Sequence, residues 1–422
     1  MLSSGGLHSY HDVSHTLRRA LHEPQRRERV DSLRAYKEWI IGSALPVWAT
    51  RGFDESAGRF RERLDRNAEP IDVPHRAMVQ ARQIYVFSHA YHLGWFPDGR
   101  QLAERAMASL LRDFADVSQR EASFAFSSDG RGGIVSPVRD AYTHAFVLFA
   151  TAWLHRISGD VTLLTLAERT DAFIRAHLFD ATQGGLFETA PATVRTKRQN
   201  PLMHLLEAYL ALERAAPGRG YLARATEIVE LFTARLFDAK HGVLLEHFAE
   251  DWSAHPDAAM TDLVEPGHHF EWVWLLREYG RLADRSLGEW SDALWRDARA
   301  HGMASDGLIH DELGSDHSVR KASHRVWPHT EAIKAAMARD ADGDASALTF
   351  ADAMARTLLE RFLDQPFTGG WVDHRSATGE PLVDYVPAST LYHLFFAASE
   401  SAHGDCAVED TTTHASQSPT LE

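Results

Sequence analysis

The sequence predicts an all-α protein, an (α/α)6 barrel of six helical hairpins connected by short β-hairpin-like loops. Two observations predict this class. Apolar residues recur at the i, i+3, i+4, i+7 spacing of an amphipathic helix in about twelve segments, and nothing long alternates with the period of two expected for strands. A short motif also recurs about every 60 residues, which indicates a repeated supersecondary unit.

The predicted helices follow one another with short gaps. Their expected bounds are 31–46, 75–95, 99–114, 138–158, 161–178, 199–214, 221–237, 267–283, 287–301, 325–340, 346–363 and 388–401. Taken in pairs, they give six units, each with a first helix, a loop and a second helix.

The recurring motif follows the first helix of each unit. An apolar residue precedes Asp, and usually Gly and further apolar residues come next, as in Phe237-Asp238 and Gly242-Val-Leu244. The aspartates stand at positions 54, 116, 180, 238, 306 and 364, with spacings of 62, 64, 58, 68 and 58 residues. This pattern predicts a Gly-turn hairpin inside every unit.

The second helix of each unit carries polar residues within apolar, aromatic-rich sequence. One such residue per unit stands at positions 82, 144, 204, 271, 331 and 393, with spacings of 62, 60, 67, 60 and 62 residues. In an open solenoid these residues would face solvent. In a closed ring they converge, so we expect a barrel with a pocket at the N-terminal ends of the second helices.

Composition limits the possible partners. The chain has 422 residues and a formal net charge of −15, which argues against binding to nucleic acid or to an anionic membrane. Cys406 is the only cysteine, so an internal disulfide and a cysteine-cluster metal site are excluded. Neither a secretory signal nor an apolar run long enough for a transmembrane helix is visible, and we expect a soluble cytoplasmic protein.

The expected domain organisation is simple. Residues 1–25 form a flexible N-terminal segment, residues 26–402 form one barrel domain, and residues 403–422 form a disordered tail rich in Ser and Thr.

Three of the 25 histidines are candidate catalysts. A single histidine on an apolar helix is more often structural, and we interpret His89 and His92 in that way. His204, His268 and His393 instead occupy corresponding positions of their repeats. Because the pKa of histidine is near 6.5, two such groups can remove a proton from one carbon and return it elsewhere.

Other polar residues complete the predicted pocket. Glu271 shares a helix face with His268, and we expect it to fix the orientation of that ring. A buried Arg82 needs an anionic partner, either Glu271 or Glu331 or a developing oxyanion. The remaining candidates are an amide, two aromatic rings suited to a sugar face or to core packing, and one further histidine: Asn200, Tyr142, Trp327 and His144. No metal-binding or phosphate-binding motif is present, so no metal is expected.

Five of these segments, taken in order, resemble one known family. They are Arg82-Gln-Ile-Tyr-Val-Phe, Met203-His-Leu-Leu-Glu-Ala, Glu265-Pro-Gly-His-His-Phe-Glu-Trp, Trp327-Pro-His-Thr-Glu-Ala and Tyr392-His393. Over roughly residues 30 to 400 the chain resembles the N-acylglucosamine 2-epimerase superfamily of (α/α)6-barrel sugar isomerases and epimerases. The segment Val386-Pro-Ala-Ser-Thr-Leu-Tyr-His393 is most similar to the mannose isomerase branch, since cellobiose 2-epimerases have Lys and Trp before this Tyr-His.

The resemblance implies roles for individual residues. It implies that His268 and His393 are the acid–base pair and that His204 binds the sugar or assists ring opening. It also implies that no metal or nucleotide cofactor takes part. The pocket wall that it implies consists of Arg82, Asn200, Glu271, Trp327 and Glu331.

The activity expected is cofactor-independent interconversion of D-mannose and D-fructose, and of D-lyxose and D-xylulose, through a cis-enediol. His393 is the favoured base for the C2 proton, Arg82 stabilises the oxyanion, and His268 delivers a proton to C1. A 2-epimerase acting on mannose or glucose, N-acylglucosamine or cellobiose is the closest alternative. A glycoside hydrolase using Glu271 and Glu331 and a non-enzymatic scaffold are more distant ones. The expected partner is a monosaccharide, and the chain is expected to be a monomer or homodimer.

Overall fold

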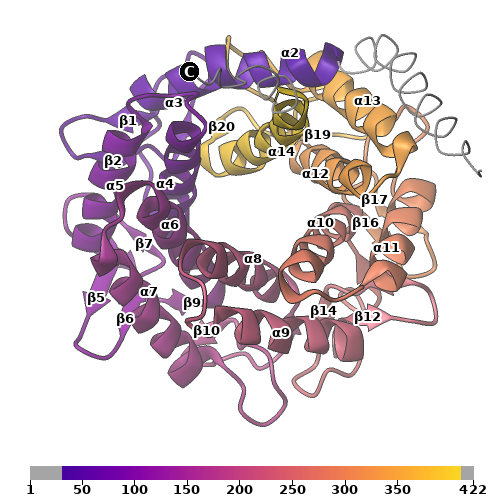
Figure 1. Cartoon of the computed structure of the whole chain (residues 1–422), viewed down its shortest axis with the longest axis horizontal. Coiled ribbons are helices and arrows are strands. Elements are labelled where there is room, and N and C mark those ends of the chain that lie inside the picture. The colour runs from indigo at the N-terminus through magenta and orange to yellow at the C-terminus, as the bar shows by residue number, and fades with distance from the viewer. Residues whose placement is uncertain (1–30, 410–422) are drawn as a thin grey trace, which may run out of the picture.

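The helices of the protein close into two concentric rings (Figure 1). The computed structural model describes residues 31–409, so the predicted flexible segment 1–25 lies outside the described residues, as does 410–422. Six inner helices surround the axis: α4 Ala77–His92, α6 Ala141–Ser158, α8 Asn200–Ala215, α10 Pro266–Ala283, α12 Trp327–Ala341 and α14 Leu391–Glu409. Each contacts the next, and α14 contacts α4, so the inner ring is closed.

The outer ring covers the apolar faces of the inner helices. It consists of α2 Asp31–Trp39 with α3 Leu45–Thr50, α5 Gly99–Phe114, α7 Val161–Phe173, α9 Tyr221–Leu231, α11 Gly288–His301 and α13 Ala345–Arg361. A π-helical turn joins α2 to α3 (Ile40–Ala44), and similar turns extend α7 (Ile174–Leu178) and α9 (Phe232–Leu236). The predicted (α/α)6 class is therefore confirmed.

A short antiparallel pairing follows every outer helix, where the sequence predicts a Gly-turn hairpin. Three of these pairings are hairpins: β1 Phe53–Asp54 with β2 Arg59–Phe60, β5 Ala115–Val117 with β6 Ala122–Phe124, and β12 Phe237–Asp238 with β13 Val243–Leu244. The other three are single bridges: Phe179 with Leu186, Met303 with Ile309, and Leu363 with Trp371. All six repeats thus share one unit.

A second set of strands links each unit to the next at the mouth of the barrel. The strands before the inner helices are β4 His75–Arg76, β9 Arg139–Asp140, β11 Lys197–Arg198, β15 Leu263–Val264, β18 His324–Arg325 and β20 Val386–Pro387. Their antiparallel partners, in the same order, are β7 Ser127–Ser128, β10 Thr189–Ala190, β14 His247–Phe248, β16 Glu312–Gly314, β19 His374–Arg375 and β3 Arg63–Leu64. The last pair joins the sixth unit to the first. Two further strands, β8 Ile134–Ser136 and β17 Val319–Lys321, pair with β7 and β16.

These links explain where the predicted helix starts were wrong. The apolar periodicity predicts helix at 75–76, 138–140 and 325–326, but β4, β9 and β18 occupy most of these residues. The backbone is extended there because its hydrogen bonds are made with the neighbouring unit.

The start of the predicted C-terminal tail also needs correction. Helix α14 continues to Glu409, so residues 403–409 are helical. Once α14 has started in the core, each added residue fixes one more hydrogen bond at low cost, and no proline interrupts Ser401-Ala-His-Gly-Asp-Cys-Ala. Within residues 31–409, no helix combines the length and apolar character that crossing a bilayer requires.

Candidate active site

The N-terminal halves of three inner helices bring together two histidines and an indole ring. His268 lies on α10, His393 on α14 and Trp327 at the start of α12. The Trp327 ring packs against both imidazoles, with centroid separations of 5.0 Å from His268 and 5.6 Å from His393. Gly267 permits this packing, because a Cβ there would lie 2.5 Å from the indole. Residues from three repeats therefore meet in one place, as the repeat pattern predicts.

His268 is held by a carboxylate that the sequence analysis did not identify. Its Nδ1 lies 2.9 Å from Oε1 of Glu246 and 3.8 Å from Oε2 of Glu265. Burial lowers the pKa of His268, but these two carboxylates outweigh that effect and raise it to about 10. The amide of Asn200 lies 3.4 Å from Nε2 on the other side of the ring. His268 is therefore an imidazolium at neutral pH and can donate a proton.

The expectation that Glu271 orients His268 is wrong. Side chains on a helix tilt toward its N-terminus, so His268 reaches up to the strand segment that carries Glu246. Glu271 lies almost one turn deeper, 3.7 Å from Nδ1 of His204. Sharing a helix face did not place the two groups in contact.

Glu246 nevertheless has a signal in the sequence. In five of the six repeats an acidic residue stands four positions after a glycine of the loop: Glu62, Glu188, Glu246, Asp311 and Asp373 follow Gly58, Gly184, Gly242, Gly307 and Gly369. All five glycines have positive φ, which turns the chain back toward the barrel mouth. Each acidic residue comes directly before a strand that links two units. This acidic position is therefore repeated along the chain, and in the fourth unit its carboxylate contacts His268.

His393 has the opposite protonation state. Its Nδ1 lies 2.8 Å from Oε1 of Glu331. Burial lowers the pKa of His393 to about 3, against the opposing effect of this hydrogen bond. The ring is therefore neutral at physiological pH, donates its Nδ1 proton to Glu331 and leaves Nε2 available to accept a proton. Although burial raises the pKa of Glu331, Lys334 and His393 lower it to about 2.

A group of buried acids lies beneath these histidines. His204 is 2% exposed, and its Nδ1 lies 3.4 Å from Glu207. Burial lowers the pKa of His204 well below its usual range. Burial also raises the pKa of Glu271 far above its ordinary value, with the nearby Glu331 carboxylate adding to the effect. Tyr392 donates a hydrogen bond to Glu207, which sequence analysis did not select.

Arg82 is buried, and its guanidinium is hydrogen-bonded to neutral groups. It is 4% exposed, donates to the carbonyl of Ser389 at 3.0 Å and to the hydroxyl of Tyr142 at 2.5 Å, and lies over the Phe146 ring. Among residues 31–409 no carboxylate lies within ion-pair distance of it, so the salt bridge considered from the sequence does not form. Its buried Nε has no hydrogen-bond partner within that range.

His144 is not a pocket residue, which corrects the sequence interpretation. Its Nε2 accepts a hydrogen bond from the backbone N–H of Phe124 and its Nδ1 donates to the carbonyl of Asp140. The ring stacks on Phe173 of the outer helix α7, with centroids 4.8 Å apart. Both nitrogens are therefore used to fasten a hairpin to an inner helix.

The same fastening recurs in other repeats. His269 and His329 each accept a hydrogen bond from the corresponding backbone N–H of Leu244 and Ile309. In the first repeat Gln80 does the same for Phe60, and its amide also donates to the Phe60 carbonyl. His144 thus corresponds to Gln80, two residues before Arg82. A repeat of about 60 residues that varies in length does not resolve this difference of two positions.

Three groups of side chains in the described part of the chain have a composition that suits a metal ion: His204 with Glu207 and Glu271, His268 with Glu246 and Glu265, and Asp297 with His301 and His317. In the third group the two imidazoles stack at 3.8 Å with an interplanar angle of 10°. Lone pairs of imidazole lie in the ring plane, so in this arrangement they do not converge on one point.

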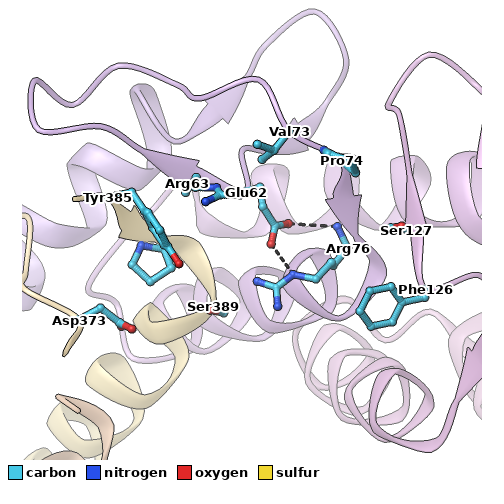
Figure 2. Close-up of a pocket in the computed structure, with 11 residues that line it drawn as sticks. Glu62, Arg63, Val73, Pro74, Arg76, Phe126, Ser127, Asp373, Tyr385 and Ser389 are labelled. Carbon is cyan, nitrogen blue, oxygen red and sulfur yellow. Dashed lines mark hydrogen bonds and ion pairs between the residues drawn. The ribbon is translucent and has the colours of Figure 1, made fainter. Parts of the chain in front are cut away.

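A cavity of about 500 Å³ opens beside Arg82 at the barrel mouth. Figure 2 shows Glu62 bonded to both the backbone N–H and the guanidinium of Arg76 on its wall. Arg63 lies over the ring of Tyr385. Ser389, whose carbonyl accepts from Arg82, also lines this cavity. The cavity therefore adjoins Arg82 through Ser389, while none of the three candidate histidines lines it.

The sequence is similar to those of known sugar isomerases and epimerases. A profile of the N-acylglucosamine 2-epimerase (GlcNAc 2-epimerase) family matches residues 58–397. A protein of Rhizobium meliloti (strain 1021) named mannose-6-phosphate isomerase is 32% identical over 371 residues, which is 86% of this chain and 94% of that protein. A D-mannose isomerase of Thermobifida fusca is 29% identical over 268 residues, 58% of this chain and 64% of the relative.

Solved structures share the fold. A cellobiose 2-epimerase from Spirochaeta thermophila DSM 6192 has a TM-score of 0.78 at 23% identity, with 92% of this chain and 99% of the other covered. A D-mannose isomerase has a TM-score of 0.76 at 18% identity, with 88% and 97% covered. The fold and the relatives together define the class, a sugar isomerase or epimerase. The chain belongs to the N-acylglucosamine 2-epimerase family, as its motifs predict.

Proposed function

We propose that the protein interconverts D-mannose and D-fructose by moving a proton between C2 and C1 of the open-chain sugar. The observation that supports this most is the pair of histidines beside Trp327. One is held neutral with an accessible ring nitrogen, and the other is held as an imidazolium by its own carboxylate. A base and an acid of opposite protonation at neutral pH suit an enediol mechanism.

In this proposal each step uses a group in the pocket. Nε2 of His393 removes the C2 proton of the open-chain aldehyde, and Glu331 stabilises the imidazolium that forms. Arg82 and Tyr142 stabilise the negative charge that develops on O1. The O2 proton moves to O1, and a proton that His268 delivers or relays to C1 completes the ketose. His204, held neutral above the buried acids, binds the sugar or assists ring opening.

A 2-epimerase is the second candidate. It needs the same enediolate, with the proton returned to the opposite face of C2 instead of C1. A cellobiose 2-epimerase of Bacteroides fragilis is 28% identical over 309 residues, 68% of this chain and 77% of that protein, which favours keeping this candidate. The cavity beside Arg82 would accommodate the second sugar ring of a disaccharide.

A glycoside hydrolase is less well supported. Glu331 is held by both His393 and Lys334, at 2.8 Å each, so it is not poised to donate a proton to a leaving group. A family 76 α-mannanase from Bacteroides thetaiotaomicron has a TM-score of 0.66 at 12% identity, which shows a common fold alone.

One experiment separates these activities. The purified protein is incubated with mannose, lyxose, glucose, fructose and cellobiose, and the products are resolved by chromatography. Fructose from mannose and xylulose from lyxose are expected. Glucose from mannose, or glucosylmannose from cellobiose, would identify an epimerase, and release of free glucose from cellobiose a hydrolase.

A second arm tests the phosphorylated sugar that the name of the Rhizobium relative suggests. Arg63 and Arg76 line the cavity, but Glu62 already binds Arg76. We therefore propose the free sugar as substrate and expect kcat/KM to be higher for mannose than for mannose 6-phosphate. Both arms are repeated after treatment with EDTA, and activity is expected to remain.

A further inference from the structure

Lys334 is a buried ammonium that lies among the buried acids of the inner helices. It lies on α12, three residues after Glu331, and it is fully buried. Its Nζ is 2.8 Å from Oε2 of Glu331 and lies over the rings of Trp274 and Phe396, at 4.6 and 4.2 Å from their centroids. Burying a lysine is costly unless its charge is compensated. Glu331 compensates it.

The contact forms part of a chain that ends at the proposed base. Oε1 of Glu331 accepts the Nδ1 proton of His393, and Oε2 of the same carboxylate faces Lys334. One carboxylate therefore stands between a fixed positive charge and the catalytic ring. Removing the charge on one side changes how strongly the carboxylate attracts a proton on the other.

Other titratable groups surround Lys334, Glu331 and His393. Those that face Lys334, Glu331 or His393 come from every neighbouring inner helix and from α2: Arg82, Tyr85, His204, Glu207, Glu271, Tyr392 and Tyr36. Glu207 and Glu271 also interact electrostatically with Lys334. Lys334 forms its ion pair with Glu331, the carboxylate that also contacts His393.

We propose that Lys334 is a positioning residue that keeps Glu331 a carboxylate with its charge compensated, and so keeps His393 neutral with Nε2 ready to accept the C2 proton. This inference rests on the function proposed above. A merely structural role for Lys334 would predict lower stability in its absence but no change in the protonation of His393.

The first test is a titration of the free protein, which needs no substrate. Lys334→Met preserves the length and apolar stem of the side chain and removes its charge. Protein labelled with ¹³C at histidine Cε1 is titrated by NMR, and the His393 signal is identified by its loss in His393→Gln. In the wild type the ring should stay neutral down to about pH 4. In Lys334→Met its midpoint should rise by about one to two pH units, because the Glu331 charge is no longer compensated.

Lys197→Met is the matched control. Lys197 is also fully buried and is paired with a carboxylate, Asp180, at 2.7 Å. It packs against Phe187 and Trp252 instead of the inner-helix acids. Its loss should lower the melting temperature and leave the His393 midpoint unchanged. An unchanged midpoint in Lys334→Met as well would overturn the proposal.

The second test is a double-mutant cycle with Glu331→Gln, measured as kcat, KM and the pH profile of kcat/KM for the sugar that the wild type converts. Lys334→Met should move the acidic limb of kcat/KM up by about one to two pH units, so that activity is lost only at pH values below about 6, while kcat and KM at pH 7 stay within about threefold of the wild type. In the Glu331→Gln background the same substitution should move the acidic limb by less than about 0.5 pH units, because Lys334 acts through Glu331. The double variant removes both charges together, so it should fold even where Lys334→Met does not.

Independent effects of the two substitutions in this cycle would refute the proposal. If the wild type converts no sugar, the proposed function fails, but the titration still decides the role of Lys334.

Discussion

Replacing Glu246 by Gln tests how His268 is kept protonated. The hydrogen bond from His268 Nδ1 to Glu246 Oε1 is 2.9 Å long, and both side chains are about 95% buried. A charge-assisted hydrogen bond contributes about 1.5–3 kcal/mol, and one pKa unit corresponds to about 1.4 kcal/mol, so its loss should lower the pKa of His268 by about one to two units. Glutamine preserves the shape of the side chain and can still accept from Nδ1.

The effect on activity depends on pH in a defined way. The pKa of His268 is raised to about 10, so the acid is present below pH 10 and is lost as the pH rises through that value. In Glu246→Gln the basic limb of kcat/KM should move down to about pH 8–9. At pH 9.5 this predicts a loss of about eightfold from protonation alone for a shift of 1.5 units, and almost none at pH 7.

The assay is the conversion of mannose measured from pH 6 to 10.5. Glu265→Gln is the matched control, because Glu265 lies farther from Nδ1, at 3.8 Å. It should move the basic limb by less than one unit, roughly in line with its weaker contact. A basic limb that stays within about 0.3 units of the wild type in Glu246→Gln would refute the assignment of His268 as the acid.

Three further predictions concern individual histidines. His393→Ala and His268→Ala should each lower kcat by about 10² to 10⁴ with the circular dichroism unchanged, whereas His89→Ala should affect stability more than turnover; retention of more than about a tenth of kcat would contradict the assigned pair. His144→Ala should lower the free energy of unfolding by about 1–3 kcal/mol and leave kcat within about threefold. His144→Gln should lower the free energy of unfolding less, because Gln80 makes the equivalent hydrogen bonds in the first repeat. A large loss of kcat in His144→Gln would indicate that His144 belongs to the active site after all. Burial lowers the pKa of His144 to about 4, below its value near 6.5 in the unfolded chain. The free energy of unfolding should therefore decline as the pH falls from about 6.5 to 4, and urea unfolding should show a shallower decline in His144→Gln. An equal decline with pH in the wild type and in His144→Gln would contradict this.

The fold could be predicted because the same helical hairpin unit is repeated six times along the sequence. A single helical hairpin of 60 residues gives a weak signal, but the repeated Asp and Gly positions define the unit and its number. Closure also followed from the sequence, since polar groups at the same place in six buried helices need a common interior. The links between units, such as β20 with β3, were not predicted because strands of two residues leave no periodicity.

The site was predicted less completely, for reasons of register and of distance in sequence. His268, His393 and Trp327 were found because they belong to one motif each and to equivalent helices. Glu246 was missed because it reaches its partner across 22 residues and a change of element. His144 was misplaced because a spacing of about 60 residues does not distinguish positions two residues apart, which lie on different faces of a helix.

Lys334 shows a third reason why the site could not be predicted completely from the sequence. In sequence, Glu331 and Lys334 form an ordinary i,i+3 pair of the kind that decorates helix surfaces. Only the closed ring places this pair in the interior, where both side chains are fully buried. Burial changes the consequence of the same spacing, from a weak surface interaction to one that sets the protonation of a neighbouring ring.

The most direct test of the account is isomerisation of mannose in D₂O, followed by NMR of the fructose formed. In the mechanism proposed, the C2 proton passes to His393 and the C1 proton comes from an imidazole, and both groups exchange with solvent. The account predicts deuterium at C1 of the fructose. Complete transfer of the original hydrogen from C2 to C1, with no solvent label even at slow turnover, would contradict it and point to a hydride shift.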